Sequence, residues 1–226
     1  MPKMGITFAL AKGRILQQTM PLLEQAGLVP SEDVLTTRKL MVDGPVVNGC
    51  PVRFLIIRAA DVCTYVMQGA ADMGIVGRDI LLESRPDVFS PLDLEIGRCR
   101  LCIAGPEALV RQGSPKRGSR IRVATKYDYL TEQYYRSQGL QSEVIHLYGS
   151  MELAPLVGMA ERIVDVVETG STLKANGLIE EATLFDISSR LIVNPASSVT
   201  RSDMIKPLIA RLREAVVAQR THRSEK

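Results

Sequence analysis

One stretch, residues 163–173, constrains the fold of this chain more than any other. It begins with the β-branched run 163–167, which predicts a buried strand. A polar segment with one glycine follows, and residues 173–182 then carry helix-forming side chains, interrupted only by Gly177. The stretch therefore predicts a strand, a tight loop and a helix, which is the repeating unit of α/β folds.

The loop of this unit has the residue types that suit a phosphate. Gly170 allows the backbone to approach a ligand closely, and Thr169, Ser171 and Thr172 offer hydroxyl donors beside the unpaired N–H groups of a helix start. The carboxylates Asp165 and Glu168 precede the loop and suit sugar hydroxyls or a magnesium-bound ligand. An ordinary strand-to-helix turn, capped by Thr169 or Ser171, is the open alternative.

The composition excludes several classes of protein. With 46% hydrophobic and 23% charged residues, the 226-residue chain is typical of a soluble globular protein with an ample core. Its net charge of +3 is too small to indicate nucleic-acid binding. The N-terminus lacks the pattern of a signal peptide, and no apolar run approaches the roughly 20 residues of a membrane helix. We therefore expect a cytoplasmic protein that binds neither nucleic acid nor a membrane.

The cysteines do not point to a metal centre. A chain of this size needs no disulfides, so reduced thiols are expected. Cys99 and Cys102 have the C-x-x-C spacing of a metal or redox site, but they lie in an apolar, strand-like run without a second pair. Since His146 and His222 are the only histidines, a zinc site is not expected.

A second strand-to-helix turn lies near the N-terminus. Residues 5–10 predict a strand, and a helix running towards Ala26 follows the turn Lys12-Gly13-Arg14. Cations beside free N–H groups would attract a polyphosphate. For this turn taken alone, surface charges without a ligand are the favoured interpretation.

The next segment predicts a parallel strand–helix–strand unit. Residues 52–57 form the clearest buried strand, a helix capped by Asp61 is expected over 62–68, and residues 72–76 predict the second strand. Ligands of such sheets gather at the C-terminal ends of the strands. Arg58 stands at such an end, which favours a ligand-binding role.

The rest of the chain predicts a second α/β series and a return to the first. Residues 120–147 form a strand–helix–strand series, and a helix opened by Gly149 is expected to end near Arg162. The chain is expected to cross between the two series near residues 95 and 185. A final helix after Asp203 has apolar residues at helical spacing and should pack on the first series.

Together, these motifs resemble the ATP phosphoribosyltransferase family over nearly the whole chain. The turn Lys12-Gly13-Arg14 is similar to a Lys-Gly-Arg turn of that family, and segments 58–79, 97–101 and 123–127 are similar to further family segments. Cys63 is a departure, since the family has a proline there. The most specific part of the resemblance is the spacing of one set of residues: Glu152, Gly158, Ala160, Ile163, Asp165, Val166, Thr169, Gly170, Thr172 and Leu173.

The resemblance implies a fold and a reaction. The fold would be two α/β domains of the type II periplasmic-binding-protein architecture, with the active site in the interdomain cleft. Domain I would comprise residues 1–95 plus 186–226, and domain II residues 96–185. The reaction would be the first step of histidine biosynthesis, in which ATP and phosphoribosyl pyrophosphate give N1-(5-phosphoribosyl)-ATP and pyrophosphate, with Mg²⁺ carried by the substrates and no protein ligand assigned to it.

The resemblance also implies roles for the site residues. Residues 169–172 would hold the 5-phosphate, while Asp165 and Glu168 would serve the rest of phosphoribosyl pyrophosphate. Lys12, Arg14 and Arg58 would be the catalytic cations that neutralise pyrophosphate or ATP phosphates. The ATP site would use Lys12, Gly13, Arg14 and Glu152, although Glu152 could instead cap its helix.

Length places the chain with the short members of the family. Long members carry a C-terminal domain that binds histidine, for which little sequence remains after Asp203. Short members work with a separate regulatory subunit that resembles histidyl-tRNA synthetase. We therefore expect a homo-oligomer that also forms a hetero-oligomer with such a subunit.

Two rival functions differ in class. A non-enzymatic nucleotide- or solute-binding protein could share the two-domain fold, since fold does not fix function. A different pentosyltransferase could use the same sugar donor. The absence of a signal peptide speaks against a periplasmic receptor, and the similarity of Lys12-Gly13-Arg14 and Arg58 to the ATP-specific family speaks against another pentosyltransferase.

Overall fold

The computed structural model describes residues 5–113 and 116–224. Internal contacts divide the chain into two α/β units. Unit 1 combines the described residues up to Leu81 with Arg85–Gly97 and the described residues from Ser188 onward, and unit 2 comprises Leu82–Ser84 and Arg98–Ile187. The sequence placed the two crossings near residues 95 and 185; the contacts divide the chain between 97 and 98 and between 187 and 188.

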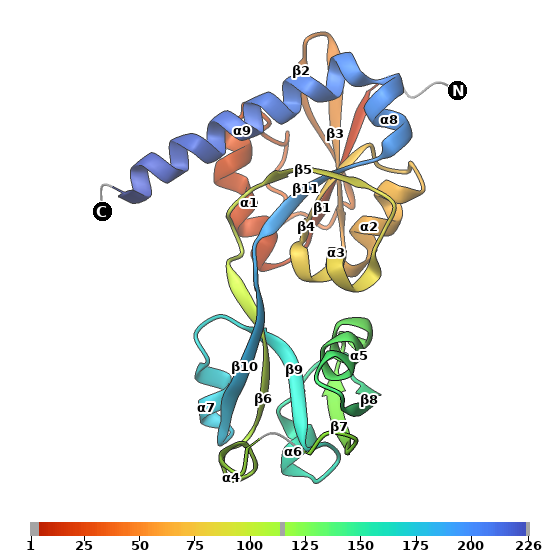
Figure 1. Ribbon diagram of the computed structural model, residues 1–226. Coiled ribbons are helices and arrows are strands. Elements are labelled where there is room, and N and C mark those ends of the chain that lie inside the picture. The colour runs from red at the N-terminus through yellow and green to blue at the C-terminus, as the bar shows by residue number, and fades with distance from the viewer. Residues whose placement is uncertain (1–4, 114–115, 225–226) are drawn as a thin grey trace. The chain divides into compact units, whose positions relative to one another are not determined.

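Unit 1 is built on a mixed sheet with strand order β2-β3-β1-β4-β11-β5 (Figure 1). The central strand β1 is parallel to both β3 and β4, as the strand–helix–strand pattern predicts. Strand β2 is antiparallel to β3, and β11 is antiparallel to β4 and β5. The strands are β1 (Ile6–Ala11), β2 (Met41–Val47), β3 (Cys50–Ile57), β4 (Met73–Gly77), β5 (Phe89–Asp93) and β11 (Ser189–Val193).

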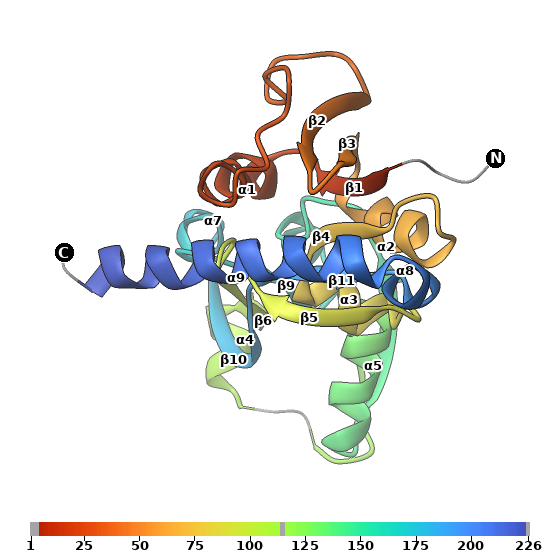
Figure 2. The same ribbon diagram turned by 90° about the horizontal axis from the view of Figure 1, so that it is seen from above.

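Helices cover both faces of this sheet. The long helix α9 packs on α1 and β5, and its Ile205, Leu208 and Leu212 are buried, as their spacing predicts (Figures 1 and 2). Asp61 lies in the first turn of α2 and does not cap it, because the helix begins at Ala59 with Arg58 in the N-cap position. The helices are α1 (Arg14–Gln25), α2 (Ala59–Met67), α3 (Arg78–Ser84), α8 (Pro195–Thr200) and α9 (Ser202–Ser224).

Strand β1 shows why the sheet can be covered on both sides. Its large side chains, Phe8 and Leu10, join the core cluster that contains α1 and α9 residues. Its small side chains, Ala9 and Ala11, face the cluster that contains α2 residues. Small residues let α2 approach the sheet closely. Large side chains therefore fill the space below α1 and α9, whereas α2 packs directly against the backbone of the sheet.

Unit 2 is a second mixed sheet, with strand order β10-β6-β9-β7-β8. Strand β7 is parallel to β8 and β9, whereas β6 is antiparallel to β9 and β10. Strand β10 carries two β-bulges, one of them at Glu181. The strands are β6 (Cys99–Pro106), β7 (Arg120–Thr125), β8 (Gln141–His146), β9 (Arg162–Val167) and β10 (Leu178–Ile187).

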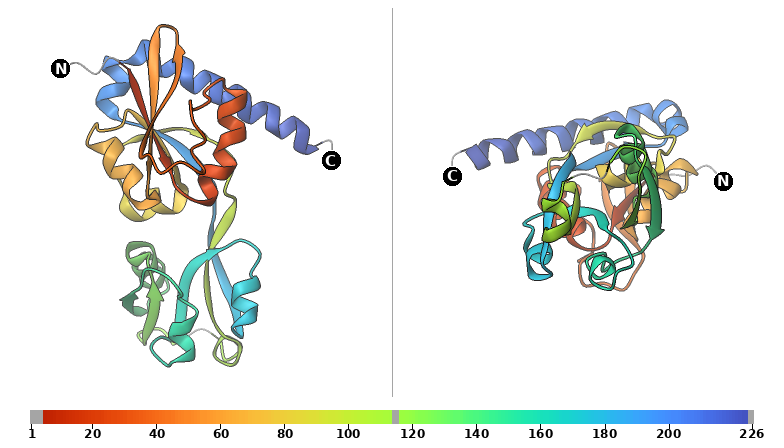
Figure 3. Two further views of the ribbon diagram at one scale, coloured as in Figure 1. Left: turned by 180° about the vertical axis from the view of Figure 1, so that it is seen from behind. Right: turned by 60° about the horizontal axis from the view of Figure 1, so that its bottom comes forward.

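Two of the helices expected in unit 2 are much shorter than predicted. The helix expected over residues 173–182 ends at Ala175, since Gly177 adopts a positive φ and β10 starts at Leu178. The helix expected from Gly149 to near Arg162 is a single turn. Figures 1 and 3 show α7 beside β10 and α5 beside β8. The helices are α4 (Glu107–Arg111), α5 (Asp128–Ser137), α6 (Leu153–Leu156) and α7 (Ser171–Ala175).

Neither unit contains, among its described residues, a helix long and apolar enough to cross a bilayer.

The close approach of α2 to the sheet gives the first testable prediction. A Cβ at Gly74 would lie 2.8 Å from Cγ1 of Val62 and 2.9 Å from Cγ2 of Val66, both fully buried on α2. We expect Gly74→Ala to lower the free energy of unfolding by about 1–3 kcal/mol through overpacking, as measured by urea denaturation.

Gly149→Ala is the matched control, because no atom lies within 4 Å of its Cβ position. Its free energy of unfolding should stay within about 0.5 kcal/mol of the unsubstituted chain. Equal effects of the two substitutions would contradict this account of the α2 packing.

Candidate functional site

The loop after β9 is the first part of the candidate site. Strand β9 ends at Val167, Glu168 to Gly170 form the loop, and α7 begins at Ser171. Gly170 occupies the left-handed region with φ 78° and ψ 4°, which a residue with a Cβ adopts at a cost. Because α7 has five residues, its dipole is small, so phosphate binding here would depend on the loop's own donors.

Those donors are present on the loop. The hydroxyls of Thr169 and Ser171 lie 3.0 Å apart, and the N–H of Ser171 donates to Oγ1 of Thr169 over 3.4 Å. Within the described part of the chain, the N–H groups of Gly170, Thr172 and Leu173 donate to no protein acceptor. The predicted cap is therefore only partly correct: Thr169 makes an internal hydrogen bond, but Gly170 holds the N-cap position. Three backbone donors remain available for an anion.

Asp165 lies on β9, two residues before the strand ends. Its Oδ1 accepts from the N–H of Val166 at 2.8 Å and lies 4.0 Å from Nζ of Lys126. Lys126 follows β7, which is parallel to β9 with Thr125 opposite Val164. The sequence matched Lys126 to a family segment but gave it no role. The parallel register is what places this cation beside the carboxylate.

Sequence reasoning placed Arg100 in a family-like segment without giving it a role, and it missed Glu180 altogether. The guanidinium of Arg100 on β6 pairs with the carboxylate of Glu180 on β10, and its Nη1 donates to the carbonyl oxygen of Glu168 at 3.0 Å. A cavity of about 440 Å³ adjoins the same loop and is lined by Thr169, Gly170 and Glu180, among others. No short motif links residues 80 positions apart, so only the fold reveals this pair.

In unit 1, the predicted cations come together at one edge of the sheet. The N–H of Lys12 donates to the carbonyl oxygen of Ile57 at 2.8 Å, and Ala11 pairs with Ile57 in the parallel register of β1 and β3. Lys12 and Arg58 therefore follow adjacent strand ends, and both are exposed, as is Arg14 at the start of α1. Gly13 holds the N-cap position of α1 between the two cations. This is the C-terminal edge of the parallel strands, where α/β sheets bind ligands.

Glu152 occupies the N-cap position of the one-turn helix α6, but its side chain makes no capping hydrogen bond. The side chain therefore does not perform the helix-cap role considered as the alternative for it. The carboxylate stays a candidate ligand group.

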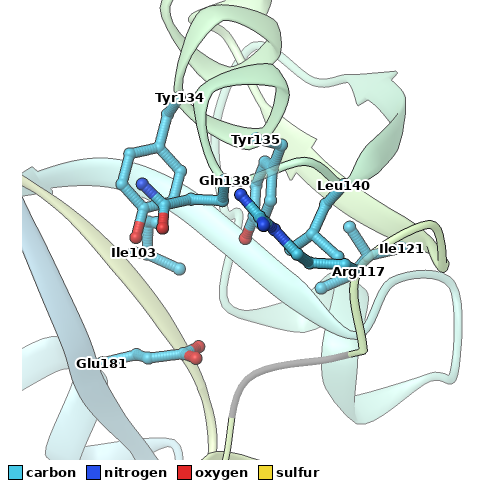
Figure 4. A pocket seen from close by; sticks show the side chains of 8 residues that line it. All are labelled: Ile103, Arg117, Ile121, Tyr134, Tyr135, Gln138, Leu140 and Glu181. Atoms are coloured by element: carbon cyan, nitrogen blue, oxygen red, sulfur yellow. The ribbon is translucent and has the colours of Figure 1, made fainter.

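A second cavity in unit 2 has a volume of about 280 Å³ (Figure 4). The rings of Tyr134 and Tyr135 and the side chain of Gln138 line one side of it, and Glu181 lies opposite. Burial raises the pKa of both tyrosines, and the negative charge of Glu181 raises them further. Glu181 is itself paired with the buried Arg162, so its charge is already neutralised within the protein.

The cysteines and other candidate metal ligands are dispersed. Among residues 5–113 and 116–224, no group of three or more His, Cys, Asp or Glu side chains could hold a metal ion. All four cysteines are free thiols, and burial is the main reason that the pKa of Cys102 is raised.

Comparisons with known proteins agree over nearly the full length. A family model described as "HisG: ATP phosphoribosyltransferase" matches residues 58–214. A protein of Acidithiobacillus ferrooxidans named ATP phosphoribosyltransferase is 50% identical over 213 residues, which are 94% of this chain and 98% of that protein. A protein of Pseudomonas aeruginosa with the same name is 50% identical over 218 residues, 96% of this chain and 100% of that protein.

Solved structures give the same picture. A chain of the ATP phosphoribosyl transferase (HisG:HisZ) complex from Thermotoga maritima is similar with a TM-score of 0.80 and 31% identity, over 94% of this chain and 99% of that one. The periplasmic aliphatic sulphonate binding protein SsuA from Escherichia coli has a TM-score of 0.57 and 15% identity, over 99% of this chain and 72% of that one. The second likeness concerns the fold alone, and it agrees with the periplasmic-binding-protein architecture expected from the sequence.

The loop geometry makes a testable prediction about anion binding. A Cβ at Gly170 would force a side chain into the left-handed region, 3.3 Å from Oε1 of Glu180. The loop would shift to avoid this conformation and the contact with Glu180, which would move its donors away from a bound anion. We therefore expect Gly170→Ala to bind ribose 5-phosphate about tenfold more weakly in calorimetric titration.

Gly177→Ala is the control, because Gly177 also has a positive φ but nothing within 4 Å of its Cβ position. It should carry a similar backbone cost while keeping its affinity for ribose 5-phosphate. Equal weakening by both substitutions would show that general destabilisation, and not the loop, controls the affinity.

Proposed function

The chain belongs to the ATP phosphoribosyltransferase family, and we propose that it transfers the phosphoribosyl group of phosphoribosyl pyrophosphate to N1 of ATP. The products are N1-(5-phosphoribosyl)-ATP and pyrophosphate, and the reaction is the first step of histidine biosynthesis. The observation that carries this proposal is similarity at about half of all positions over nearly the whole length of relatives with that name. A non-enzymatic binding protein shares only the fold with this chain.

The chemistry requires alignment and charge stabilisation more than covalent catalysis. The lone pair of adenine N1 forms a bond to the anomeric carbon while the bond from that carbon to pyrophosphate breaks. The protein must hold the two reactants in line and stabilise the negative charge that moves onto pyrophosphate. Exposed cations and unpaired backbone donors are the groups that suit this task.

In unit 2, we assign residues 169–172 to the 5-phosphate and Asp165 with Glu168 to the rest of phosphoribosyl pyrophosphate. The unpaired N–H groups of Gly170 and Thr172 support the phosphate role. Lys126, 4.0 Å from Asp165, keeps that carboxylate compensated beside a polyanionic substrate.

In unit 1, we assign Lys12, Arg14 and Arg58 to the phosphates of ATP or to the leaving pyrophosphate. Their support is the shared strand edge, which keeps Lys12 and Arg58 on adjacent chain segments. Gly13 would let ATP approach the backbone between Lys12 and Arg14, and Glu152 of unit 2 is the further ATP contact. Loss of one well-placed cation should lower turnover by about 10²- to 10³-fold, as removal of an oxyanion donor does.

Magnesium fits this assignment as a companion of the substrates. Mg²⁺ is commonly bound through one or two carboxylates and substrate phosphates, and the described residues offer single carboxylates such as Asp165 but no cluster. When bound, it would neutralise charge on pyrophosphate.

We also propose a partner. The similar chain from Thermotoga maritima comes from a HisG:HisZ complex. This supports a hetero-oligomer with a separate subunit. We propose that this subunit is regulatory and resembles histidyl-tRNA synthetase, that the chain also forms a homo-oligomer, and that it acts in the cytoplasm.

Pyrophosphate release tests the function and the partner together. With ATP, phosphoribosyl pyrophosphate and Mg²⁺, the purified chain should release pyrophosphate at a rate that added histidine does not change. Inhibition by histidine would mean that this chain has its own effector site. Failure to bind phosphoribosyl pyrophosphate would overturn the proposed function.

Thr169→Ala tests the loop assignment. Loss of a hydrogen bond to a charged phosphate should raise the KM for phosphoribosyl pyrophosphate about 10- to 100-fold, with a much smaller change in the KM for ATP. Thr200→Ala is the control, since the exposed Oγ1 of Thr200 donates only to the carbonyl oxygen of Ala196. Full activity of Thr169→Ala would contradict the assignment of residues 169–172 to the 5-phosphate.

A further inference from the structure

Arg100 ties two strands of unit 2, β6 and β10, to the base of the loop that follows β9. Its Nε donates to Oε2 of Glu180 at 2.9 Å, its Nη2 donates to the other oxygen of that carboxylate, and its Nη1 donates to the carbonyl oxygen of Glu168 at 3.0 Å. The guanidinium is planar and rigid, so these bonds fix the Glu168 carbonyl relative to β6 and β10.

The position of that carbonyl controls the first peptide of the loop. The peptide group is planar and trans, so the N–H of Thr169 points away from the carbonyl oxygen of Glu168. Because Arg100 draws the oxygen towards β6, the N–H of Thr169 is directed to the opposite side. The loop therefore starts in a defined orientation before any ligand binds, which lowers the entropic cost of binding.

Arg100 also controls the charge next to the loop. Oε1 of Glu180 lies 3.3 Å from the Cβ position of Gly170, so an ionised carboxylate borders the segment assigned to the phosphate. The hydrogen bond from Arg100 lowers the pKa of Glu180, burial opposes this, and the Cys102 thiol 3.4 Å away adds a further donor. Without Arg100, that negative charge would repel a phosphate.

We propose that Arg100 is a positioning residue for phosphoribosyl transfer, which orients the phosphate loop through the Glu168 carbonyl and neutralises Glu180 beside it. Glu180 in turn holds the guanidinium in place. This inference depends on the assignment of residues 169–172 to the 5-phosphate. The competing explanation is an ordinary ion pair, since both side chains are 31% exposed and such pairs contribute little to stability.

Binding of phosphoribosyl pyrophosphate to the full chain separates the two explanations. Arg100→Met keeps the length of the side chain but removes its charge and donors, and we expect about 10- to 100-fold weaker binding. Arg100→Lys keeps the positive charge but lacks the planar, forked guanidinium. Its affinity for phosphoribosyl pyrophosphate should lie between that of Arg100→Met and that of the unsubstituted chain. Unchanged affinity in Arg100→Met would overturn the inference.

The double variant isolates the charge effect. Glu180→Gln alone should change the affinity less than about threefold, because Arg100 stays and the amide oxygen still accepts a hydrogen bond. Arg100→Met combined with Glu180→Gln should bind more tightly than Arg100→Met, since the uncompensated carboxylate is gone. Equal or weaker binding by the double variant would contradict the neutralising role.

The pH profile adds a readout that a merely structural role would not move. Besides Arg100 and Cys102 on β6, titratable groups that line the cavity beside Glu180 are Lys174 on α7 and Glu107 on α4. In Arg100→Met, protonation of Glu180 at low pH removes the repulsion. The affinity gap to the unsubstituted chain should therefore narrow as the pH falls from 7 to about 5, and should stay constant in the double variant. A constant gap in Arg100→Met would contradict the proposed charge effect.

Arg122→Met is the matched control for loss of an ion pair in the same sheet. Arg122 on β7 pairs with Glu161, with Nη2 and Oε1 3.1 Å apart, and contacts no loop residue assigned to substrate. It should keep its affinity for phosphoribosyl pyrophosphate.

The failure of this inference can be distinguished from failure of the loop assignment. If Thr169→Ala binds phosphoribosyl pyrophosphate as tightly as the unsubstituted chain, the proposed loop role fails. If Thr169→Ala binds weakly while Arg100→Met binds normally, only the present inference fails.

Discussion

The loop after β9 is anchored at its base by a side chain from another strand. One carbonyl, that of Glu168, receives a hydrogen bond from Arg100 on β6, and the same guanidinium is locked by Glu180 on β10. Within the loop, the hydroxyls of Thr169 and Ser171 lie 3.0 Å apart, the N–H of Ser171 donates to Oγ1 of Thr169, and a five-residue helix follows. Such a loop can leave its backbone donors unpaired for a ligand because its conformation is secured elsewhere.

The register of parallel strands positions the other charged residues of the candidate site. In unit 1, the register of β1 and β3 places Lys12 and Arg58 at one sheet edge. In unit 2, the register of β7 and β9 places Lys126 beside Asp165. Lys12, Arg58 and Lys126 each directly follow a strand, and Asp165 lies near the end of one, while the strands themselves supply the core. The packed strands therefore give a rigid support for the polar residues of the site.

The sequence predicted the parts of the fold that local patterns encode. The buried strands β1, β3, β4 and β9 and the apolar face of α9 were found where their spacing placed them. Strand β10 was mistaken for a helix in part, because its two bulges break the alternation that marks a strand. The Arg100–Glu180 pair could not be foreseen, since its partners meet only when distant strands pair.

Some residues of the candidate site could likewise be proposed from the sequence, and others could be found only in the structure. Residues of the central motif, from Asp165 to Thr172, could be proposed from sequence because glycine, hydroxyls and carboxylates occur within one strand-to-loop unit. Three residues support them: Arg100 and Glu180 lie on other strands, and Lys126 directly follows one. Their contacts with the motif are visible only in the structure.

Amide hydrogen exchange, followed by NMR, tests the central claim most directly. If residues 169–172 bind the 5-phosphate, phosphoribosyl pyrophosphate should shift the amide resonances of Gly170, Thr172 and Leu173 and slow their exchange. ATP alone should leave these three amides unchanged. Saturating phosphoribosyl pyrophosphate that leaves them unaltered would contradict the account.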